Sequence, residues 1–190
     1  MEKIITEETF TNKDFSRDGI EIAEYEVCLF KNCNFQNCDL SSLKFMDCVF
    51  EDCNLSSVKM NNTSLQTVEF RDCKILGVHF DDCNTFGLSL SFEGCQLNHS
   101  VFFQLQIPKT KFIDSKLIEV DFAECDLRDS QFQHSDLSGA IFENCDLQKA
   151  DFRNANNYSF DPEMNKLKNA KFTLDGLPGL LGKYKIKVEH

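Results

Sequence analysis

A large apolar side chain recurs at every fifth residue through most of this chain. The first run extends from Phe10 to Phe80, and all 15 positions at this spacing hold Phe, Leu, Ile, Met or Tyr. A second run, shifted by two residues, extends from Phe92 to Phe152 and fills all 13 of its positions in the same way. A period of five fits neither an amphipathic helix nor a half-buried strand. The chain must instead coil, with one large inward side chain in each group of five residues.

A longer period of 20 residues lies within the short one. Every twentieth residue from Phe10 to Phe70 is Phe, and so is every twentieth residue from Phe92 to Phe152. Four groups of five therefore form one turn, and successive turns should hydrogen-bond at the strand spacing of about 4.8 Å. This self-similarity predicts an all-β solenoid. We expect one domain over residues 1–190, with coils from about 8 to 172, a phase break at 85–91 and a C-terminal tail over 173–190.

All ten cysteines occupy one position of the repeat, two residues before a large apolar side chain. They are Cys28, Cys33, Cys38, Cys48, Cys53, Cys73, Cys83, Cys95, Cys125 and Cys145. Zinc sites usually pair cysteines two to four residues apart, whereas these recur at multiples of five. We therefore interpret them as small core residues, and expect no metal site and no disulfide framework. Met1 to Thr11 lacks the apolar core of a secretion signal, so we expect a reducing, cytoplasmic location.

The negative charge is concentrated in the repeats. The formal net charge is -11, and residues 1–160 hold 27 acidic and 14 basic side chains, while residues 161–190 hold 4 and 6. On a regular coil the acids should form columns, with Asp146 directly above Asp126 and Asp72 above Asp52. We expect a partner-binding acidic surface formed by Asp121, Glu124, Asp126, Asp129, Glu143, Asp146, Asp151, Asp52 and Asp72.

Such columns on a rod resemble, coarsely, the regular phosphate charge of duplex DNA. A basic protein groove that accepts DNA could accept this rod, which would make the protein a DNA mimic. The alternative is that acidity only keeps a flat-sided β-protein soluble and discourages edge pairing. Direct nucleic-acid binding is not expected, because the sequence has no basic stripe. No apolar run reaches membrane-spanning length.

The sequence contains no pattern that indicates an enzyme. His79, His99 and His134 fall at outward positions in different coils, and none has a defined partner for acid-base or metal chemistry. A convex coil has no obvious pocket in which burial could tune carboxylate pKa values. Glycine-rich phosphate loops and nucleophile motifs are also missing. We therefore expect no catalytic residues and no cofactor.

The repeating pattern resembles the pentapeptide-repeat proteins. It is small, polar, Phe or Leu, polar, polar, as in Ser135 to Gly139, Cys145 to Lys149 and Ala150 to Asn154. The resemblance covers about nine tenths of the chain and implies a right-handed quadrilateral parallel β-helix. It is specific for the fold, whereas function depends on the polar residues between the inward positions.

The C-terminal segment from Leu174 to Val188 looks like the tail of the quinolone-resistance (Qnr-type) and microcin-immunity (McbG-type) members. In those proteins a short helix and a small strand follow the last coil and form a head-to-head homodimer. The apolar tail residues to which this role would fall are Leu177, Leu180, Leu181, Tyr184, Ile186 and Val188. The alternative is that they only cap the open end of the solenoid.

The same resemblance implies that DNA gyrase or topoisomerase IV is the partner, with protection from quinolones or a peptide toxin as the outcome. Many Qnr-type proteins carry two projecting loops that matter for this protection, and this chain has no comparable insertions. Topoisomerase binding without drug protection is therefore one expected outcome. The rival hypothesis is an acidic protein-interaction scaffold with an unrelated partner.

Two aromatic residues fall outside the inward register. Phe86 lies in the phase break at 85–91, where two residues are added, and Phe103 follows the inward Phe102. The break can serve as a bulge that restores the register, with Gly87 adopting an unusual backbone conformation. Alternatively, both aromatics belong to a recognition surface. Structure is the favoured interpretation at both positions.

Overall fold

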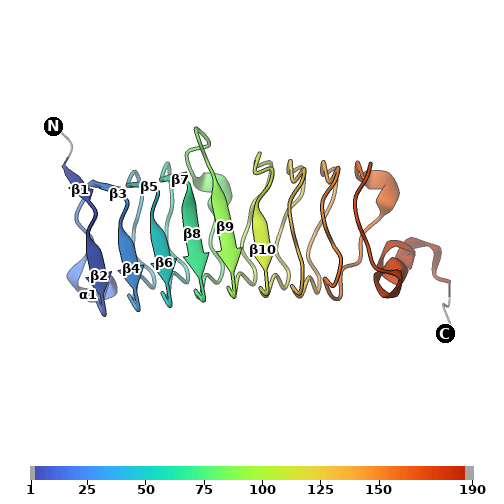
Figure 1. Ribbon diagram of the computed structural model, residues 1–190, viewed down its shortest axis with the longest axis horizontal. Helices are drawn as coiled ribbons and strands as arrows, with labels where there is room; N and C mark the ends of the chain where they lie inside the picture. Colours follow the sequence, from blue (N-terminus) through green and yellow to red (C-terminus); the bar gives the residue numbers. More distant parts are fainter. Residues whose placement is uncertain (1–2, 187–190) are drawn as a thin grey trace.

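The computed structural model describes residues 3–186, which form a right-handed, four-sided parallel β-helix (Figure 1). The coils succeed one another along a single axis, so the two ends of the chain lie at opposite ends of a rod. The all-β solenoid predicted from the period of five is thereby confirmed.

Short parallel strands line two sides of the rod. One sheet has the order β1-β3-β5-β7 and the other the order β10-β9-β8-β6-β4-β2. In later coils isolated bridges such as Lys111↔Gln131 and Gln131↔Asp151 continue the parallel pairing of the second sheet. The strands are β1 (Ile4–Thr6), β2 (Thr9–Thr11), β3 (Glu24–Glu26), β4 (Leu29–Lys31), β5 (Lys44–Met46), β6 (Val49–Glu51), β7 (Ser64–Gln66), β8 (Val68–Arg71), β9 (Leu90–Glu93) and β10 (Lys111–Ile113).

The phase break is a local loop that does not disturb the coils around it. Ser64 pairs with Asn84 at a separation of 20 residues, but Val68 pairs with Leu90 at a separation of 22. The two added residues therefore lie between Asn84 and Leu90, where Figure 1 shows a loop projecting from the middle of the rod. The change of register from 20 to 22 residues thus falls within this segment.

Each side of the rod is named here after its inward residue in the coil that contains Phe112. The Phe112 face stacks Phe10, Phe30, Phe50, Phe70, Phe92, Phe112, Phe132, Phe152 and Phe172. The Leu117 face contains Leu97, Leu117 and Leu137, the Phe122 face contains Phe80, Phe102, Phe122 and Phe142, and the Leu127 face contains Ile107, Leu127 and Leu147. The Phe122 face lies opposite the Phe112 face, and the Leu127 face opposite the Leu117 face.

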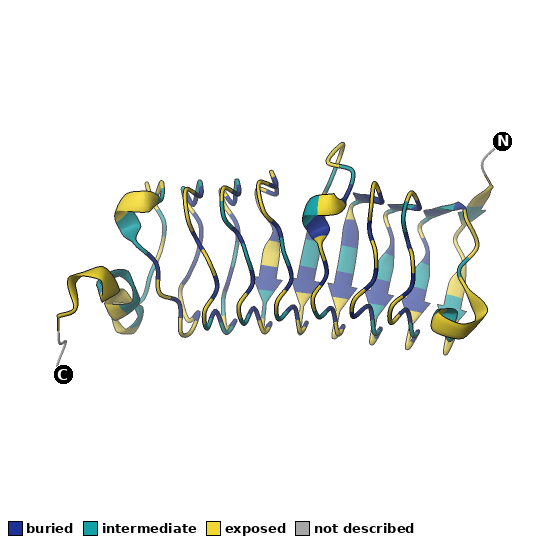
Figure 2. Cartoon of the chain, turned by 180° about the vertical axis from the view of Figure 1, so that it is seen from behind, coloured by how far each residue is buried: buried dark blue, intermediate teal, exposed yellow. Residues whose placement is uncertain are grey.

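Aromatic rings fill the centre of the rod. Rings on the Phe112 face stack with centroids 4.7 to 5.3 Å apart, as for Phe132 with Phe152 and Phe112 with Phe132. The Phe122 ring meets the Phe112 ring edge-on at 5.3 Å. Both geometries are favourable for aromatic pairs. Figure 2 shows the resulting pattern, in which buried and exposed residues alternate along every coil.

Backbone geometry at the corners explains the polar residues after each inward side chain. The second residue after it has a left-handed conformation in most groups of five, as for Asn32 (φ 53), Asp52 (φ 54) and Asp129 (φ 59). Asn and Asp tolerate this region better than other residues with side chains. Part of the Asn and Asp content of the repeats is therefore needed for folding.

The ten cysteines are buried and free, so their predicted inward placement is confirmed. The sequence interpretation missed that most of these thiols are also hydrogen-bond donors. Cys53 Sγ donates to the Phe30 carbonyl oxygen at 3.2 Å, and Cys125 Sγ to that of Phe102 at 2.8 Å. Ser135 Oγ makes the equivalent bond to Phe112 at 2.7 Å. The position thus favours a small side chain that can donate to the preceding coil.

These buried thiols predict a loss of stability at alkaline pH. Burial raises the pKa of the Cys48, Cys83 and Cys125 thiols to about 12, so between pH 9 and 12 they ionise in the unfolded chain alone. The unfolded state then binds fewer protons than the folded state, and stability falls as pH rises, by about 1.4 kcal/mol per pH unit for each such thiol. Urea unfolding at pH 8 and pH 10 would measure this; equal midpoints would contradict it.

Short helices occur at both ends and at one corner. They are α1 (Phe15–Asp18), η1 (Phe80–Asp82), η2 (Pro162–Met164), η3 (Leu174–Leu180) and η4 (Gly182–Tyr184). The predicted tail helix is thus a pair of 3-10 turns. Ile186 is irregular, and Val188 lies outside the described residues, so the predicted tail strand stays a prediction.

The tail covers the last coil through two glycines. A Cβ atom on Gly176 would lie 1.9 Å from the Tyr158 hydroxyl, and one on Gly179 would lie 2.1 Å from the Tyr158 carbonyl oxygen. Glycine is therefore required for η3 to approach the buried Tyr158. Leu180 packs against the core, which makes capping part of the role of the tail.

Candidate functional site

The nine acidic candidates lie on three faces of the rod. The Phe122 face carries Asp121, Glu124 and Glu143, and the Leu127 face carries Asp126, Asp129 and Asp146. Asp52, Asp72 and Asp151 belong to the Phe112 face and its corner. The structure therefore divides the partner-binding acidic surface expected from the sequence between separate sides of the rod.

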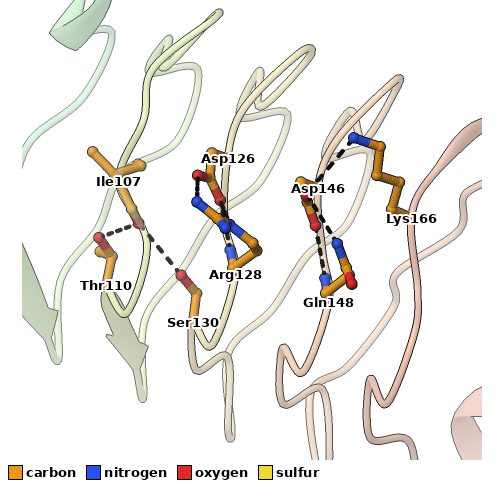
Figure 3. Close-up of polar contacts among 8 residues, drawn as sticks. All are labelled: Ile107, Thr110, Asp126, Arg128, Ser130, Asp146, Gln148 and Lys166. Carbon is orange, nitrogen blue, oxygen red and sulfur yellow. Dashed lines mark hydrogen bonds and ion pairs between the residues drawn. The ribbon is translucent and has the colours of Figure 1, made fainter.

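The predicted stacking of Asp126 and Asp146 is confirmed by their parallel bridge. Both carboxylates are nevertheless compensated by basic groups (Figure 3). Arg128 donates to the two Asp126 oxygens at 2.8 and 2.6 Å, and Lys166 Nζ lies 3.8 Å from Asp146 Oδ2. The Arg128 guanidinium lowers the pKa of Asp126. This column consequently offers a partner much less charge than its carboxylate count suggests.

Asp151 is not available as a surface charge. Only 6% of the residue is exposed, and its carboxylate accepts hydrogen bonds from Arg153, with the shortest at 2.7 Å. Lys171 Nζ lies 3.8 Å away. The pKa of Asp151 is lowered mainly by Arg153. Its expected place in an exposed acidic flank is therefore wrong.

Aspartates that precede an inward residue also have a structural role. Asp121 Oδ1 accepts from the Ala123 amide at 2.8 Å, and Asp126 Oδ1 from the Arg128 amide at 3.2 Å. Asp146 accepts from the Gln148 amide in the same way. Such local bonds favour Asp in this position whatever the protein binds. The functional signal must therefore come from acids that lack a nearby base.

The Phe122 face has that property over four successive coils. Within residues 78–82, 100–104, 120–124 and 140–144 there are five carboxylates and no Lys or Arg. They are Asp81, Asp82, Asp121, Glu124 and Glu143. In the described part of the chain none of the five forms an ion pair with Lys or Arg, and His79 Nδ1 lies 3.3 Å from Asp81. This uncompensated set is the acidic face of the rod.

The neighbouring Leu127 face is electrically balanced in the same part of the rod. Its residues 83–89, 105–109, 125–129 and 145–149 hold Asp126, Asp129 and Asp146 against Lys109, Arg128 and Lys149. The sequence could have revealed this contrast, because residues on either side of an inward position point out from the same face. Asp126 and Arg128 are such a pair.

A second, partly compensated acidic corner runs along the Phe112 face. Asp52 and Asp72 follow each other in register there, as expected, and both are exposed. Nearby Glu51 pairs with Lys31 at 2.5 Å, and Glu69 pairs with Arg71. The corner therefore carries less uncompensated negative charge than the acidic face. It lies on the opposite side of the rod.

The tail residues divide into two groups. Leu180 and Leu181 are half-buried, whereas Leu177, Tyr184 and Ile186 are 40%, 53% and 57% exposed. Lys183 links η4 to η2 through Asp161 Oδ1 at 2.8 Å and Glu163 Oε2 at 2.6 Å. This ion pairing, together with a Tyr184 hydroxyl bond to Glu163 at 3.2 Å, holds the tail against the last coil.

Across residues 3–186 no three His, Cys, Asp or Glu side chains come together in a way that could hold a metal ion. The same residues contain no helix with the length and apolar character needed to span a bilayer. Phe86 and Phe103 point outward as expected, with 81% and 38% of each residue exposed.

Comparisons with known proteins agree on the fold. The family model described as pentapeptide repeat region matches residues 23–102, 86–152 and 105–177. A trypsin-treated form of QnrB1, a plasmid-mediated fluoroquinolone resistance protein, aligns with a TM-score of 0.65 at 18% identity, covering 98% of this chain and 100% of that one. HetL, a pentapeptide repeat protein involved in heterocyst differentiation regulation in the cyanobacterium Nostoc, aligns with a TM-score of 0.68 at 15% identity, covering 92% and 88%. No curated protein matches the sequence.

Proposed function

Because the chain belongs to the pentapeptide repeat family and has one uncompensated acidic face, we propose that it is a non-catalytic DNA mimic. Its partner is a type II topoisomerase, DNA gyrase or topoisomerase IV, whose DNA-binding groove would receive the rod. The similarity to QnrB1 supports this partner, because fluoroquinolones act on type II topoisomerases. HetL shows that the same fold also occurs in a regulatory protein. The fold alone therefore does not identify the partner, and the support for DNA mimicry comes from the charge distribution.

The observation that carries the proposal is the run of five carboxylates without a Lys or Arg on the Phe122 face. Coils are about 4.8 Å apart, and three of these four coils carry the charge, whereas the phosphates along one DNA strand are about 3.4 Å apart. A groove that neutralises phosphates with Lys and Arg can neutralise this face in the same way. Association would be steered by long-range attraction and weakened by salt.

Supercoiling by purified DNA gyrase tests the proposal. We expect the protein to inhibit supercoiling, because it competes with DNA for the groove. We expect no protection from ciprofloxacin, because the loop between Asn84 and Leu90 adds only two residues to the repeat. Unchanged supercoiling together with no binding at low salt would favour the scaffold hypothesis.

We also propose that the exposed apolar side of the tail joins two copies of the chain. Leu177→Glu should then convert a dimer into a monomer of 21.9 kDa in light-scattering measurements. Leu177 is the better choice than the half-buried Leu181, because a charge at Leu181 would also disturb the cap.

Ile22→Glu is the matched control for this substitution. Ile22 is 84% exposed at the other end of the rod, so the variant should stay dimeric. A wild-type protein that is monomeric, or a Leu177→Glu variant that is still a dimer, would leave the tail with a capping role alone.

A further inference from the structure

Apolar side chains interrupt the acidic face at outward positions. Phe103 and Ile141 are 38% and 41% exposed, and Val101 beside them is half-buried. Parallel bridges join Val101 to Asp121 and Asp121 to Ile141, so these three residues form one column over three coils. Phe103 lies on the same coil as Val101, across the inward Phe102. We call Val101, Phe103 and Ile141 the apolar patch.

Carboxylates surround this patch. The bridge between His79 and Val101 places Asp81 one coil before Phe103, and the same register places Glu143 two coils after it. Asp121 lies between Val101 and Ile141. Glu124 accepts a hydrogen bond from Gln104 at 2.7 Å, next to Phe103. Asp121 therefore lies within the patch, and Asp81, Glu124 and Glu143 form an acidic rim around it.

The apolar surface continues toward the C-terminal end. Ile141 and Glu143 also line a groove of about 500 Å³ between the last coils and the tail. Met164 lies in this groove and is 48% exposed. Exposed apolar side chains thus occur from Phe103 to this groove, whose lining also includes the charged Asp161 and Lys183.

Charge alone does not explain these side chains. Phosphates have no apolar counterpart to Phe or Ile, so charge mimicry does not account for them at these positions. Binding energy at protein interfaces is concentrated in a few large side chains surrounded by polar contacts. An apolar centre within a polar rim is the usual arrangement of such interfaces.

We propose that the apolar patch and its acidic rim are one docking surface for a protein groove that combines Lys and Arg side chains with an apolar contact. This rests on the proposed function and identifies the contact within it: the rim meets the DNA-binding residues of the topoisomerase, and Phe103 and Ile141 insert against an apolar part of the same groove. The rim accelerates association and the patch slows dissociation.

The double variant Phe103→Ser/Ile141→Ser tests the docking surface. Binding to DNA gyrase holoenzyme would be measured over a series of salt concentrations. We expect affinity to fall by about tenfold or more at every salt concentration, since a few large side chains near the centre of an interface carry most of the binding energy. The slope of log K against log salt should stay as in wild type, because no charge changes.

Phe86→Ser is the matched control, because it removes an exposed Phe from the loop beside the Leu127 face. It should leave the affinity within about twofold of wild type. If the double variant binds as wild type, or if Phe86→Ser weakens binding as much, the docking surface is wrong and the proposed function stands. If wild-type protein fails to bind gyrase at low salt, both are wrong.

Discussion

Replacing Phe112 by Ala should lower the free energy of unfolding by about 3 to 5 kcal/mol, as for other large core aromatics. The Phe112 ring stacks between Phe92 and Phe132, each at 5.3 Å, and meets the Phe102 and Phe122 rings edge-on. Each coil is supported only by its neighbours, so the hole cannot be filled by distant parts of the chain. Urea unfolding measures the loss.

Phe86→Ala is the control for this change. It removes the same side chain from a position that is 81% exposed and should alter stability by less than about 0.5 kcal/mol. Core truncations of this kind normally cost more than about 1 kcal/mol. If the free energy of unfolding of Phe112→Ala differs from that of wild type by less than this, the aromatic column does not hold the coils together.

Neutralising the acidic face should abolish most of the affinity for the topoisomerase. In the variant Asp121→Asn/Glu124→Gln/Glu143→Gln, three of the five carboxylates without a basic partner are removed. We expect affinity at about 50 mM salt to fall by tenfold or more, and the salt dependence to become shallower, because fewer counterions are released. Titrations of gyrase at several salt concentrations measure both quantities.

The matched control is Asp126→Asn/Asp129→Asn/Asp146→Asn on the Leu127 face. It changes the net charge by the same three units, in the same coils, but removes carboxylates from a balanced face, where Asp126 pairs with Arg128 and Asp146 with Lys166. We expect its affinity to stay within about threefold of wild type. Equal losses in both variants would mean that only total charge matters and that no particular face is recognised.

The inward register could be predicted from the sequence because it depends on one local rule. A large side chain at every fifth residue and a small one two residues earlier leave a single way of burying both, which is a four-sided coil. The phase break was also visible, since Phe80 and Phe92 are 12 residues apart instead of ten. Both features are set by residues close together in the chain.

The distribution of charge over the faces was harder to predict. Asp126 and Asp146 were expected to be bare carboxylates, but Arg128 lies two residues from one of them and Lys166 lies one coil above the other. Asp151 was expected at the surface and is buried between Arg153 and Lys171. The register shows which bases lie near each carboxylate, and a comparison of the residues on each face would have identified them. Whether a base and a carboxylate make contact depends on side-chain conformation, which the register does not specify.

The tail could be predicted only in outline. Its apolar residues and glycines indicated a short capping element, but the contacts of Gly176 and Gly179 with Tyr158 join residues that no repeat relates. Similarly, the thiols donate hydrogen bonds to carbonyl oxygens of the preceding coil. The five-residue period does not specify how close these atoms lie. In both cases the five-residue period does not show which atoms come into contact.

The most direct test of the central claim is competition for the DNA-binding groove. DNA gyrase would be loaded with labelled duplex DNA at about 50 mM salt, where electrostatic binding is strong, and the protein would be titrated in while DNA release is followed by fluorescence anisotropy. We predict complete displacement of the DNA by the wild-type protein and much weaker displacement by Asp121→Asn/Glu124→Gln/Glu143→Gln. Binding of the protein to gyrase without release of DNA would contradict it.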